Sequence, residues 1–446
     1  MKNTMKYLAG LMLVVMMTGC FPQQKIIWSP DGNQAVVLSD DGELYRCDPD
    51  GTLSEKLLDD VVRVAWRKDS HGLVLARMEK VSNWEDAQKL LCSDEARDLI
   101  AIGDTVYANW LQTRDLVLAT DAACSNALLS DNQKDLVSYY LRDRYSDLAE
   151  DVVQPDPVEM LIIQLATLDD AGIKLGHGVA GASDLVFDLR ISPADDAVAY
   201  SAGDIFESPG PVCLYVAALT GSGVFHRVAS STCLYPDWSK DGQYLVYAVS
   251  KIQVTADELV LGAIVRRQVA DEKGLIEAMP DEEDMVGLIM NPLVRVRCLP
   301  DNSIVFSAFE VQLPAVAGDM PEYMNFFLFD PQRPATAVRL FPRTIEPYLG
   351  ESSMLFEPSP DGRKIAFLDS QNRTAIVTLS TGELKQVPHS NSEDFLPSWR
   401  GNEEVYAVCK TEVKEDGETR RYMVRYVVDA DSDPVEISTS WPEDML

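Results

Sequence analysis

Residues 28–38 read Trp-Ser-Pro-Asp-Gly-Asn-Gln-Ala-Val-Val-Leu, a turn-forming motif followed by an apolar run. Pro30 presets a backbone angle that suits a tight turn, Asp31 can accept a hydrogen bond from nearby backbone, and Gly32 tolerates positive φ. The run Ala35–Leu38 suits a strand that is buried on both faces. The stretch therefore predicts two antiparallel strands joined by a tight turn.

The same pattern recurs along the chain. Close copies begin at Trp238 and Pro358, and each precedes an apolar run, Tyr244–Tyr247 and Lys364–Phe367. With the weaker copies counted, eight positions are equivalent to Trp28: Trp28, Trp66, Trp110, Ile191, Trp238, Cys298, Pro358 and Trp399. A repeat of about 40 residues that holds four strands is typical of a β-propeller. Residues 25–446 are therefore expected to form an all-β, eight-bladed β-propeller of four-stranded antiparallel blades, with seven blades as the alternative.

The second and third units contain the segments between the clear copies. Strands are expected at 89–93 and 98–102 in the second unit and at 115–120 in the third. The third unit also holds the largest insertion, between residues 121 and 158. Apolar and amphipathic residues recur there at every fourth position: Leu136, Tyr140, Arg144 and Leu148. This spacing predicts an amphipathic helix inserted in blade three.

The first 20 residues are expected to lie outside the fold. Lys2 and Lys6 precede an apolar stretch, Leu8–Met17, that is too short to span a bilayer comfortably, as in a signal peptide. The segment ends in Thr18-Gly19-Cys20, and small residues directly before a cysteine resemble the lipobox of bacterial lipoproteins. The alternative is an ordinary signal peptide with a chance cysteine.

The resemblance to a lipobox implies that residues 1–19 are removed and that Cys20 carries acyl chains such as palmitate. Residues 20–24 would then be a lipidated tether, and more than one acyl chain anchors a protein stably. Position 21 is Phe and not Asp, which in Gram-negative lipoproteins implies export to the outer membrane. The expected location is the bacterial outer membrane, facing the periplasm or exposed at the surface.

The copies of the motif at Trp28, Trp238 and Ser359 resemble the WD40-like propeller repeat of the periplasmic protein TolB. The same repeat occurs in the propellers of prolyl oligopeptidase-type enzymes. The resemblance covers nearly all of residues 25–446, and it implies the fold and not a function. The catalytic G-x-S-x-G motif of the peptidases does not occur in the sequence.

Composition and motifs argue against several classes of function. A formal net charge of −32 repels phosphate backbones, so no nucleic-acid partner is expected. The four histidines form no H-E-x-x-H pair, and the cysteines form no C-x-x-C pair. We therefore expect no catalytic residue, no metal site and no cofactor. His177 beside Ser183 and Asp184 is better explained as a blade connection than as a triad, because triad geometry is set by the fold.

Five residues are candidates for binding a protein partner: Tyr139, Tyr140, Arg142, Arg144 and Tyr145. Tyrosine and arginine dominate interface hot spots. The alternative is that Tyr140 and its neighbours only pack this helix onto the propeller. A disulfide between Cys213 and Cys233 is also expected, because these residues would lie on the same face of adjacent blades.

These observations favour a membrane-anchored, monomeric, non-catalytic propeller that acts as a scaffold for an unidentified envelope protein. The alternative is an envelope enzyme, or a sugar- or peptide-binding protein, that uses the central funnel of the propeller. The Ser-Pro-Asp-Gly turns join first to second strands on one face, whereas insertions at 121–158 and 311–322 join second to third strands on the other. Because residues 21–24 reach only about 14 Å, the insertion-bearing face is expected next to the membrane.

Overall fold

The computed structural model describes part of the chain. It covers residues 24–446 except 92, 125–128, 130, 182–185, 204–211, 220–224, 230–234, 254–259, 269–284, 290–293, 310–323, 333–337, 341–347, 350–354, 391–394, 413–418, 431 and 443–444. The expected signal peptide at 1–19, Cys20, Cys233 and the insertion at 311–322 lie outside the described residues.

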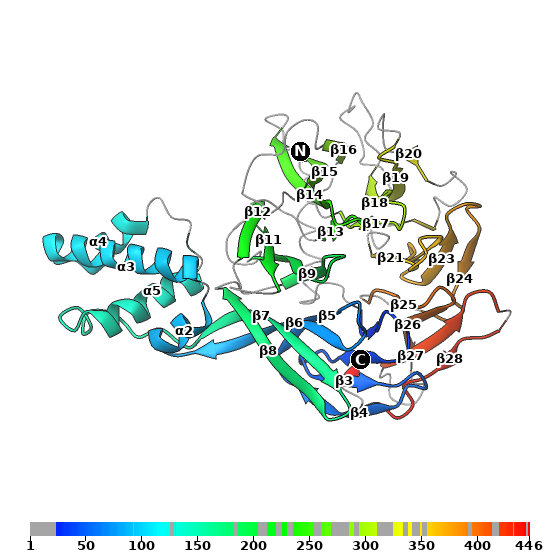
Figure 1. Ribbon diagram of the computed structural model, residues 1–446, viewed down its shortest axis with the longest axis horizontal. Helices are drawn as coiled ribbons and strands as arrows, with labels where there is room; N and C mark the ends of the chain where they lie inside the picture. The colour runs from blue at the N-terminus through cyan, green and yellow to red at the C-terminus, as the bar shows by residue number, and fades with distance from the viewer. Residues whose placement is uncertain are drawn as a thin grey trace.

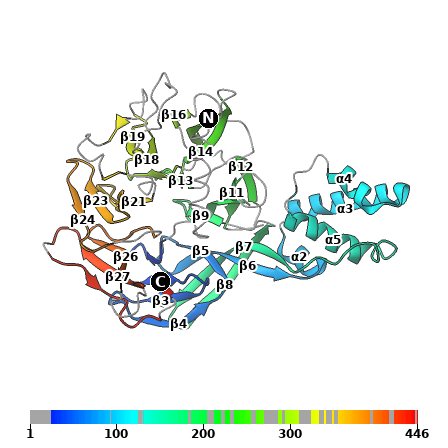
Figure 2. The same cartoon turned by 180° about the vertical axis from the view of Figure 1, so that it is seen from behind.

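The described residues form seven antiparallel sheets of four strands each, arranged in a ring as the blades of a propeller (Figures 1 and 2). Blade one consists of β1 (Ile26–Trp28), β2 (Ala35–Leu38), β3 (Leu44–Cys47) and β4 (Leu53–Leu58). Blade two consists of β5 (Val61–Trp66), β6 (Gly72–Val81), β7 (Val158–Asp169) and β8 (Gly172–Gly181). Blade three consists of β9 (Val186–Ile191), β10 (Ala197–Ala202), β11 (Cys213–Ala218) and β12 (Phe225–Ala229).

The remaining four blades follow in chain order. Blade four consists of β13 (Asp237–Trp238), β14 (Tyr244–Gln253), β15 (Val260–Gln268) and β16 (Met285–Ile289), and blade five of β17 (Val296–Cys298), β18 (Ile304–Phe309), β19 (Met324–Phe329) and β20 (Val338–Arg339). Blade six consists of β21 (Phe356–Pro358), β22 (Lys364–Leu368), β23 (Thr374–Thr378) and β24 (Leu384–Gln386). Blade seven consists of β25 (Ser398–Arg400), β26 (Glu404–Glu412), β27 (Thr419–Val427) and β28 (Val435–Glu436).

The turn between first and second strands forms as its sequence predicts. The hydroxyl of Ser29 donates to Asp31 at 2.6 Å, Asp31 accepts from the backbone of Asn33 at 3.1 Å, and Gly32 has a φ of 70°. The same serine–aspartate bond recurs at Ser239 and Ser359. The repeated motif is therefore a repeated turn, which confirms that part of the sequence analysis.

Tryptophans at the ends of first strands join neighbouring blades. Three indole N–H groups donate to a backbone carbonyl in the first strand of the preceding blade: Trp66 to Ile27 (2.8 Å), Trp238 to Arg190 (3.0 Å) and Trp399 to Glu357 (2.9 Å). Trp28 differs, because its buried Nε1 has no acceptor among the described residues and its ring packs on Tyr406 at 4.8 Å. The exception lies where the last blade meets the first.

A belt of contacts between successive turns runs around one face of the propeller. Five of these contacts are hydrogen bonds: Asp31 N–H to Ser70 Oγ, Lys68 N–H to Asp195, Lys240 N–H to Asn302 Oδ1, Asp361 N–H to Asn402 Oδ1, and Arg400 Nε to the Gly32 carbonyl. The other two are packing contacts, in which Pro193 lies beside Gly242 and Pro300 lies beside Gly362. All seven junctions between blades carry such a contact, so the ring closes with seven members.

The main expectation of eight blades is therefore wrong, and the alternative of seven is confirmed. Trp110 does not start a blade, because it lies buried in a helix whose apolar residues Leu99, Val106 and Trp110 follow helical spacing. The segments 89–93, 98–102 and 115–120 are helical for the most part and form no blade strand. Trp66 and Trp399 also lack the full Pro-Asp-Gly turn and do lie in first strands, so a tryptophan alone does not distinguish a blade strand from a helix.

The helical insertion belongs to blade two and not to blade three. It joins β6 to β7 and contains α2 (Trp84–Leu90), α3 (Ser93–Thr113), α4 (Leu116–Cys124) and α5 (Asp131–Arg144). The helix expected from Leu136, Tyr140, Arg144 and Leu148 is thus confirmed as α5, but it ends at Arg144, and Leu148 lies in the turn that follows. Residues 82–157, called the arm below, project sideways from the rim of the propeller (Figures 1 and 2).

The first and last blades meet without sharing a strand, at a junction called the seam below. The tail after β28 crosses it: Trp441 Nε1 donates to the Gly51 carbonyl at 2.7 Å, and Trp441 and Met445 pack with Ile26 and Cys47. The C-terminus accordingly lies beside β3 (Figure 1). Side-chain packing and a few hydrogen bonds, and not a mixed blade, close the ring.

The chain enters blade one on the face opposite the Ser29 turn. Lys25 precedes β1, and its buried ammonium pairs with Asp40 in the connection between β2 and β3. That connection lies on the same face as the junction of β6 and β7 with the arm, because strands alternate direction in every blade. The first described residues and the base of the arm therefore share one face of the propeller.

Candidate functional site

The arm has its own hydrophobic core, which brings its four helices together. Asn83 caps α2 by accepting from the backbone of Asp86, and Asp115 caps α4 by accepting from Leu118 N–H at 3.1 Å. α5 runs outward beside α3, since Gln133 donates to Glu95 near the base and Tyr145 stacks on Tyr107 farther out. The arm is thus a packed unit that extends from blade two.

Aromatic rings form a continuous row along the arm. From the outer end inward the successive contacts are Arg114 over Trp110 (4.5 Å), Trp110 with Tyr107 (5.9 Å), Tyr107 with Tyr145 (3.7 Å), Tyr145 with Tyr140 (6.1 Å) and Tyr140 with Trp84 (5.2 Å). The hydroxyls of Tyr140 and Tyr145 both donate to Asp104, and these bonds lower the pKa of that carboxyl. These contacts, each of a kind that stabilises packed aromatic side chains, link the base of the arm to its outer end.

The five predicted binding residues lie together but differ in accessibility. Tyr139 and Tyr140 are buried, and the hydroxyl of Tyr139 donates to the Asp156 carbonyl at 2.8 Å. Arg142 is half-buried and donates to the Val152 carbonyl, Tyr145 is half-buried, and Arg144 is exposed. The two buried tyrosines hold the arm together, and a role of the group in binding a partner stays a prediction.

Exposed apolar side chains lie on both sides of the turn between α3 and α4. Leu111 is 44% exposed, Val117 72% and Leu118 54%, and Val153 on the segment after α5 is 86% exposed. Four of the seven large apolar residues that are exposed in the described chain lie in the arm. We call Leu111, Val117 and Leu118 the apolar tip. The sequence analysis missed it, although two of its residues stand in the apolar run Leu116–Ala119.

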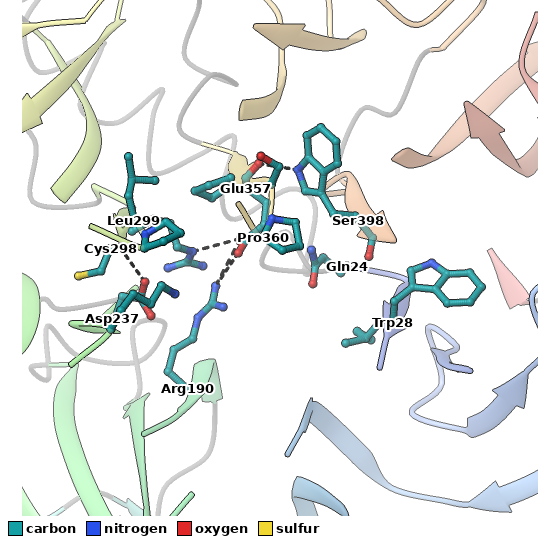
Figure 3. Close-up of a pocket in the computed structure, with 16 residues that line it drawn as sticks. Gln24, Trp28, Arg190, Asp237, Cys298, Leu299, Glu357, Pro360 and Ser398 are labelled. Carbon is teal, nitrogen blue, oxygen red and sulfur yellow. Dashed lines mark hydrogen bonds and ion pairs between the residues drawn. The ribbon is translucent and has the colours of Figure 1, made fainter. Parts of the chain in front are cut away.

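The second candidate site is the central channel, where seven charged side chains meet. They come from the first strands of blades three to six and their flanks: Asp188, Arg190, Asp237, Lys240, Arg295, Arg297 and Glu357. Glu357 accepts from three arginines, Arg190 at 3.3 Å, Arg295 at 2.8 Å and Arg297 at 3.1 Å. Because Arg190 in blade three reaches Glu357 in blade six, the network spans the channel (Figure 3).

Burial and pairing set the protonation of this network. Burial lowers the pKa of Arg190, but Asp188 and Glu357 more than offset it, so its pKa lies above its usual value. Burial raises the pKa of Asp237, and its carboxylate accepts the Cys298 N–H at 2.8 Å. Tyr235, under Arg295, has its pKa raised to about 12 by burial. Arg190 therefore stays charged, whereas burial disfavours the charged form of Asp237.

A cavity of about 230 Å³ opens onto the network. Arg190, Arg297 and Lys240 line it together with Asp237 and Glu357 (Figure 3). Gln24, Ile27, Trp28, Ser398 and Trp399 line its other side. The described residues hold no group of three or more His, Cys, Asp or Glu side chains that could bind a metal.

The sequence carries a signal for this network. Arg190, Asp237, Arg297 and Glu357 each stand directly before a position equivalent to Trp28. Side chains alternate along a strand, so the residue before the Trp lies on the opposite face of the sheet, and at these four positions it lines the cavity. Charged residues at that position in four successive units predict a charged channel wall.

The predicted disulfide is not resolved by the structure. Cys213 begins β11 and is buried, and Cys233 lies outside the described residues, so the bridge stays a prediction. Cys47, Cys298 and Cys409 are also buried in strands. His177 lies exposed on β8, and the Ser183 and Asp184 once considered with it are not described. Among the described helices, none is long and apolar enough to cross a membrane.

Comparison with known proteins supports the fold. No protein-family model and no curated protein matches the sequence. Among solved structures, hydrazine synthase of Kuenenia stuttgartiensis is similar with a TM-score of 0.50 and 10% identity, over 92% of this chain and 97% of that chain. The β-propeller domain of Cps50 (Swd1) from Myceliophteria thermophila reaches a TM-score of 0.47 at 10% identity, over 90% and 97%. Acylaminoacyl peptidase of Pyrococcus horikoshii reaches 0.37 at 15% identity, over 62% and 41%. At 10% identity, the likeness to hydrazine synthase is one of fold alone.

Proposed function

We propose that this chain is a lipid-anchored, TolB-like propeller of the bacterial envelope that acts as a scaffold and binds a protein partner through its arm. The observation that carries the proposal is the apolar tip. Leu111, Val117 and Leu118 are exposed at the outer end of an otherwise well-packed arm, and clustered exposed apolar residues mark interaction sites. The propeller supplies a rigid base, and the row of aromatic rings fixes the direction of the arm.

The anchor is proposed from the sequence. Lys2, Lys6 and the apolar run before Thr18-Gly19-Cys20 have the order of a lipoprotein leader. A lipid on Cys20 would place Lys25, and with it the face that carries the base of the arm, near the membrane. The partner would then be membrane-embedded or close to the membrane surface.

The docking experiment compares two charged variants in the native host. Membranes are solubilised in detergent, and the affinity-tagged full-length chain is purified with its stoichiometric partner. The double variant Val117→Asp/Leu118→Asp should lose the partner, because two carboxylates would have to be buried in the interface. Val435→Asp is the matched control, since Val435 is 52% exposed on β28 and lies outside the arm.

The outcomes separate the two parts of the proposal. Equal recovery of the partner by both variants would remove the arm from the binding site. The anchor is tested by labelling with palmitate, which should be incorporated by the native chain and not by Cys20→Ala. A native chain without label, recovered in the soluble fraction, would contradict the lipoprotein assignment.

A further inference from the structure

The wall of the central cavity is charged on one side and uncharged on the other. In blades three to six, the residue before the Trp-equivalent position that lines the cavity is charged: Arg190, Asp237, Arg297 and Glu357. In blades seven and one the corresponding residues are Ser398 and Ile27. The indole-bearing residues Trp28 and Trp399 lie on the uncharged side. A ligand in this cavity would meet ionic groups on one side and an apolar surface on the other.

Positive charge exceeds negative charge at the cavity. Arg190, Arg297 and Lys240 line it with three positive charges, against two carboxyls, those of Asp237 and Glu357. Behind the wall, Arg295 and Asp188 add one charge of each sign. Since the whole chain has a net charge of −32, this excess is a local feature and not a reflection of composition. An uncompensated positive charge in a partly buried site favours a bound anion.

Hydrogen-bond donors also exceed acceptors in the network. Arg190 donates through Nε to Asp188 and through Nη2 to Glu357, and its Nη1 forms no bond with the described residues. The Nε of Arg295 is buried without an acceptor in the described part of the chain. The three arginine bonds to Glu357 of 3.3 Å or less all end on Oε2, and Oε1 accepts from Arg190 Nη2 at 3.5 Å. Because Arg295 lies behind the wall, the donor that an oxyanion in the cavity would satisfy is Arg190 Nη1.

We infer that the central cavity binds a small molecule with a carboxylate or phosphate group and an apolar body. The oxyanion lies against Arg190 and Lys240, because arginine binds planar oxyanions through paired N–H groups. The apolar body lies against Ile27 and Trp399. This site is independent of the arm and of the proposed protein partner.

The experiment measures binding of three probes to the purified full chain at constant ionic strength, which is balanced with sodium chloride. Benzoate carries an oxyanion and an apolar ring, inorganic phosphate carries the oxyanion alone, and benzyl alcohol carries the ring alone. Titration calorimetry and the shift in melting temperature are read in parallel. We expect benzoate to bind most tightly, phosphate to compete with it, and benzyl alcohol to give no shift.

Two lysine variants test the location of the site. Lys240→Gln should weaken benzoate and phosphate binding about tenfold, as expected for the loss of a bond to a charged group. Lys68→Gln is the matched control, because Lys68 holds the same place in the turn of blade two, is exposed, and does not line the cavity. Arg190→Gln, checked by circular dichroism for folding, should abolish binding of both anions.

Three results would overturn the inference. Binding of neither anion beyond the chloride control would show that the network only joins blades. Equal weakening by Lys240→Gln and Lys68→Gln would show unspecific attraction. Benzyl alcohol binding as tightly as benzoate would show an apolar pocket and not an oxyanion site.

Discussion

Two adjacent positions of the repeat have different roles: one joins neighbouring blades, and the residue before it lines the central cavity. The Trp-equivalent residue points to the neighbouring blade, as the bond from Trp238 to the Arg190 carbonyl shows. The residue before it lines the central cavity, as Arg190 and Asp237 do, and the Asp237 carboxylate also accepts the Cys298 N–H of the next blade. At this scale the chain combines a repeated structural residue with a variable neighbour that is free to acquire a function.

Asp237→Asn should change stability in a pH-dependent way. Burial raises the pKa of Asp237 in the folded chain, so ionisation costs folding free energy that the unfolded chain does not lose. Below about pH 4, near the unfolded value for aspartate, the native chain and the variant should be similar in this respect. As pH rises through the raised pKa, the native chain should lose stability relative to Asp237→Asn.

Urea unfolding of both proteins at a series of pH values between 4 and 8 measures this difference. The amide of the variant can still accept the Cys298 N–H, so the comparison isolates the charge. A difference in unfolding free energy that does not change with pH would contradict the argument.

Among the elements, the arm depends on close packing between two helices. Gly103 in α3 faces Tyr140 in α5, and a Cβ at position 103 would lie 2.4 Å from the Tyr140 ring. That ring cannot move away easily, because its hydroxyl is bonded to Asp104 and it packs on Trp84. Glycine is therefore required in the middle of a long helix, where it would otherwise be unfavourable.

Gly103→Ala should destabilise the arm by about 1–3 kcal/mol, as overpacking does, despite the better helix propensity of alanine. Hydrogen exchange should become faster for the amides of α3 and α5 and stay unchanged in the blades far from the arm. Thr105→Ala is the control at an exposed position of the same helix and should leave exchange in α5 unchanged. Slower exchange in Gly103→Ala would show that the helices have room to adjust.

The elements also show where prediction from sequence succeeds and fails. The Ser-Pro-Asp-Gly turns and α5 were predictable, because their residues act locally through turn chemistry and helical spacing. Trp110 led to the expectation of an eighth blade, because a tryptophan can be buried in a helix as well as in a strand. The apolar tip and the link from Arg190 to Glu357 depend on which segments meet in space, and only the channel-facing position gave a signal for the latter.

At the scale of the whole molecule, the ring is closed by the seam between blades seven and one. Trp28 lacks the bond that Trp66, Trp238 and Trp399 make to the preceding blade. The tail compensates through Trp441, whose indole bonds the Gly51 carbonyl across the seam. The seam thus relies on a segment that follows the last strand.

Trp441→Ala should destabilise the propeller by about 3–5 kcal/mol, the usual loss for a buried aromatic side chain. Trp441→Phe should cost about 1–2 kcal/mol, because the Gly51 carbonyl loses its partner while the ring stays. Hydrogen exchange should rise in blades one and seven. Trp66→Phe is the control, because it removes an equivalent bond at the junction of blades one and two. If hydrogen exchange rose in blade seven for both variants, the seam would have no special role.

The first described residues contact both blades that meet at this seam. The amide of Gln24 donates to the Pro397 carbonyl beside blade seven at 3.1 Å, and Lys25 pairs with Asp40 of blade one while its ammonium lies 5.0 Å from the Phe395 ring. Any tension applied to the chain ahead of Gln24 would therefore be carried by the contacts that close the ring. A force applied at that end would act on the contacts of the seam first and on the opposite blades last. The resistance of the propeller to such a force would therefore depend on the junction that closes the ring.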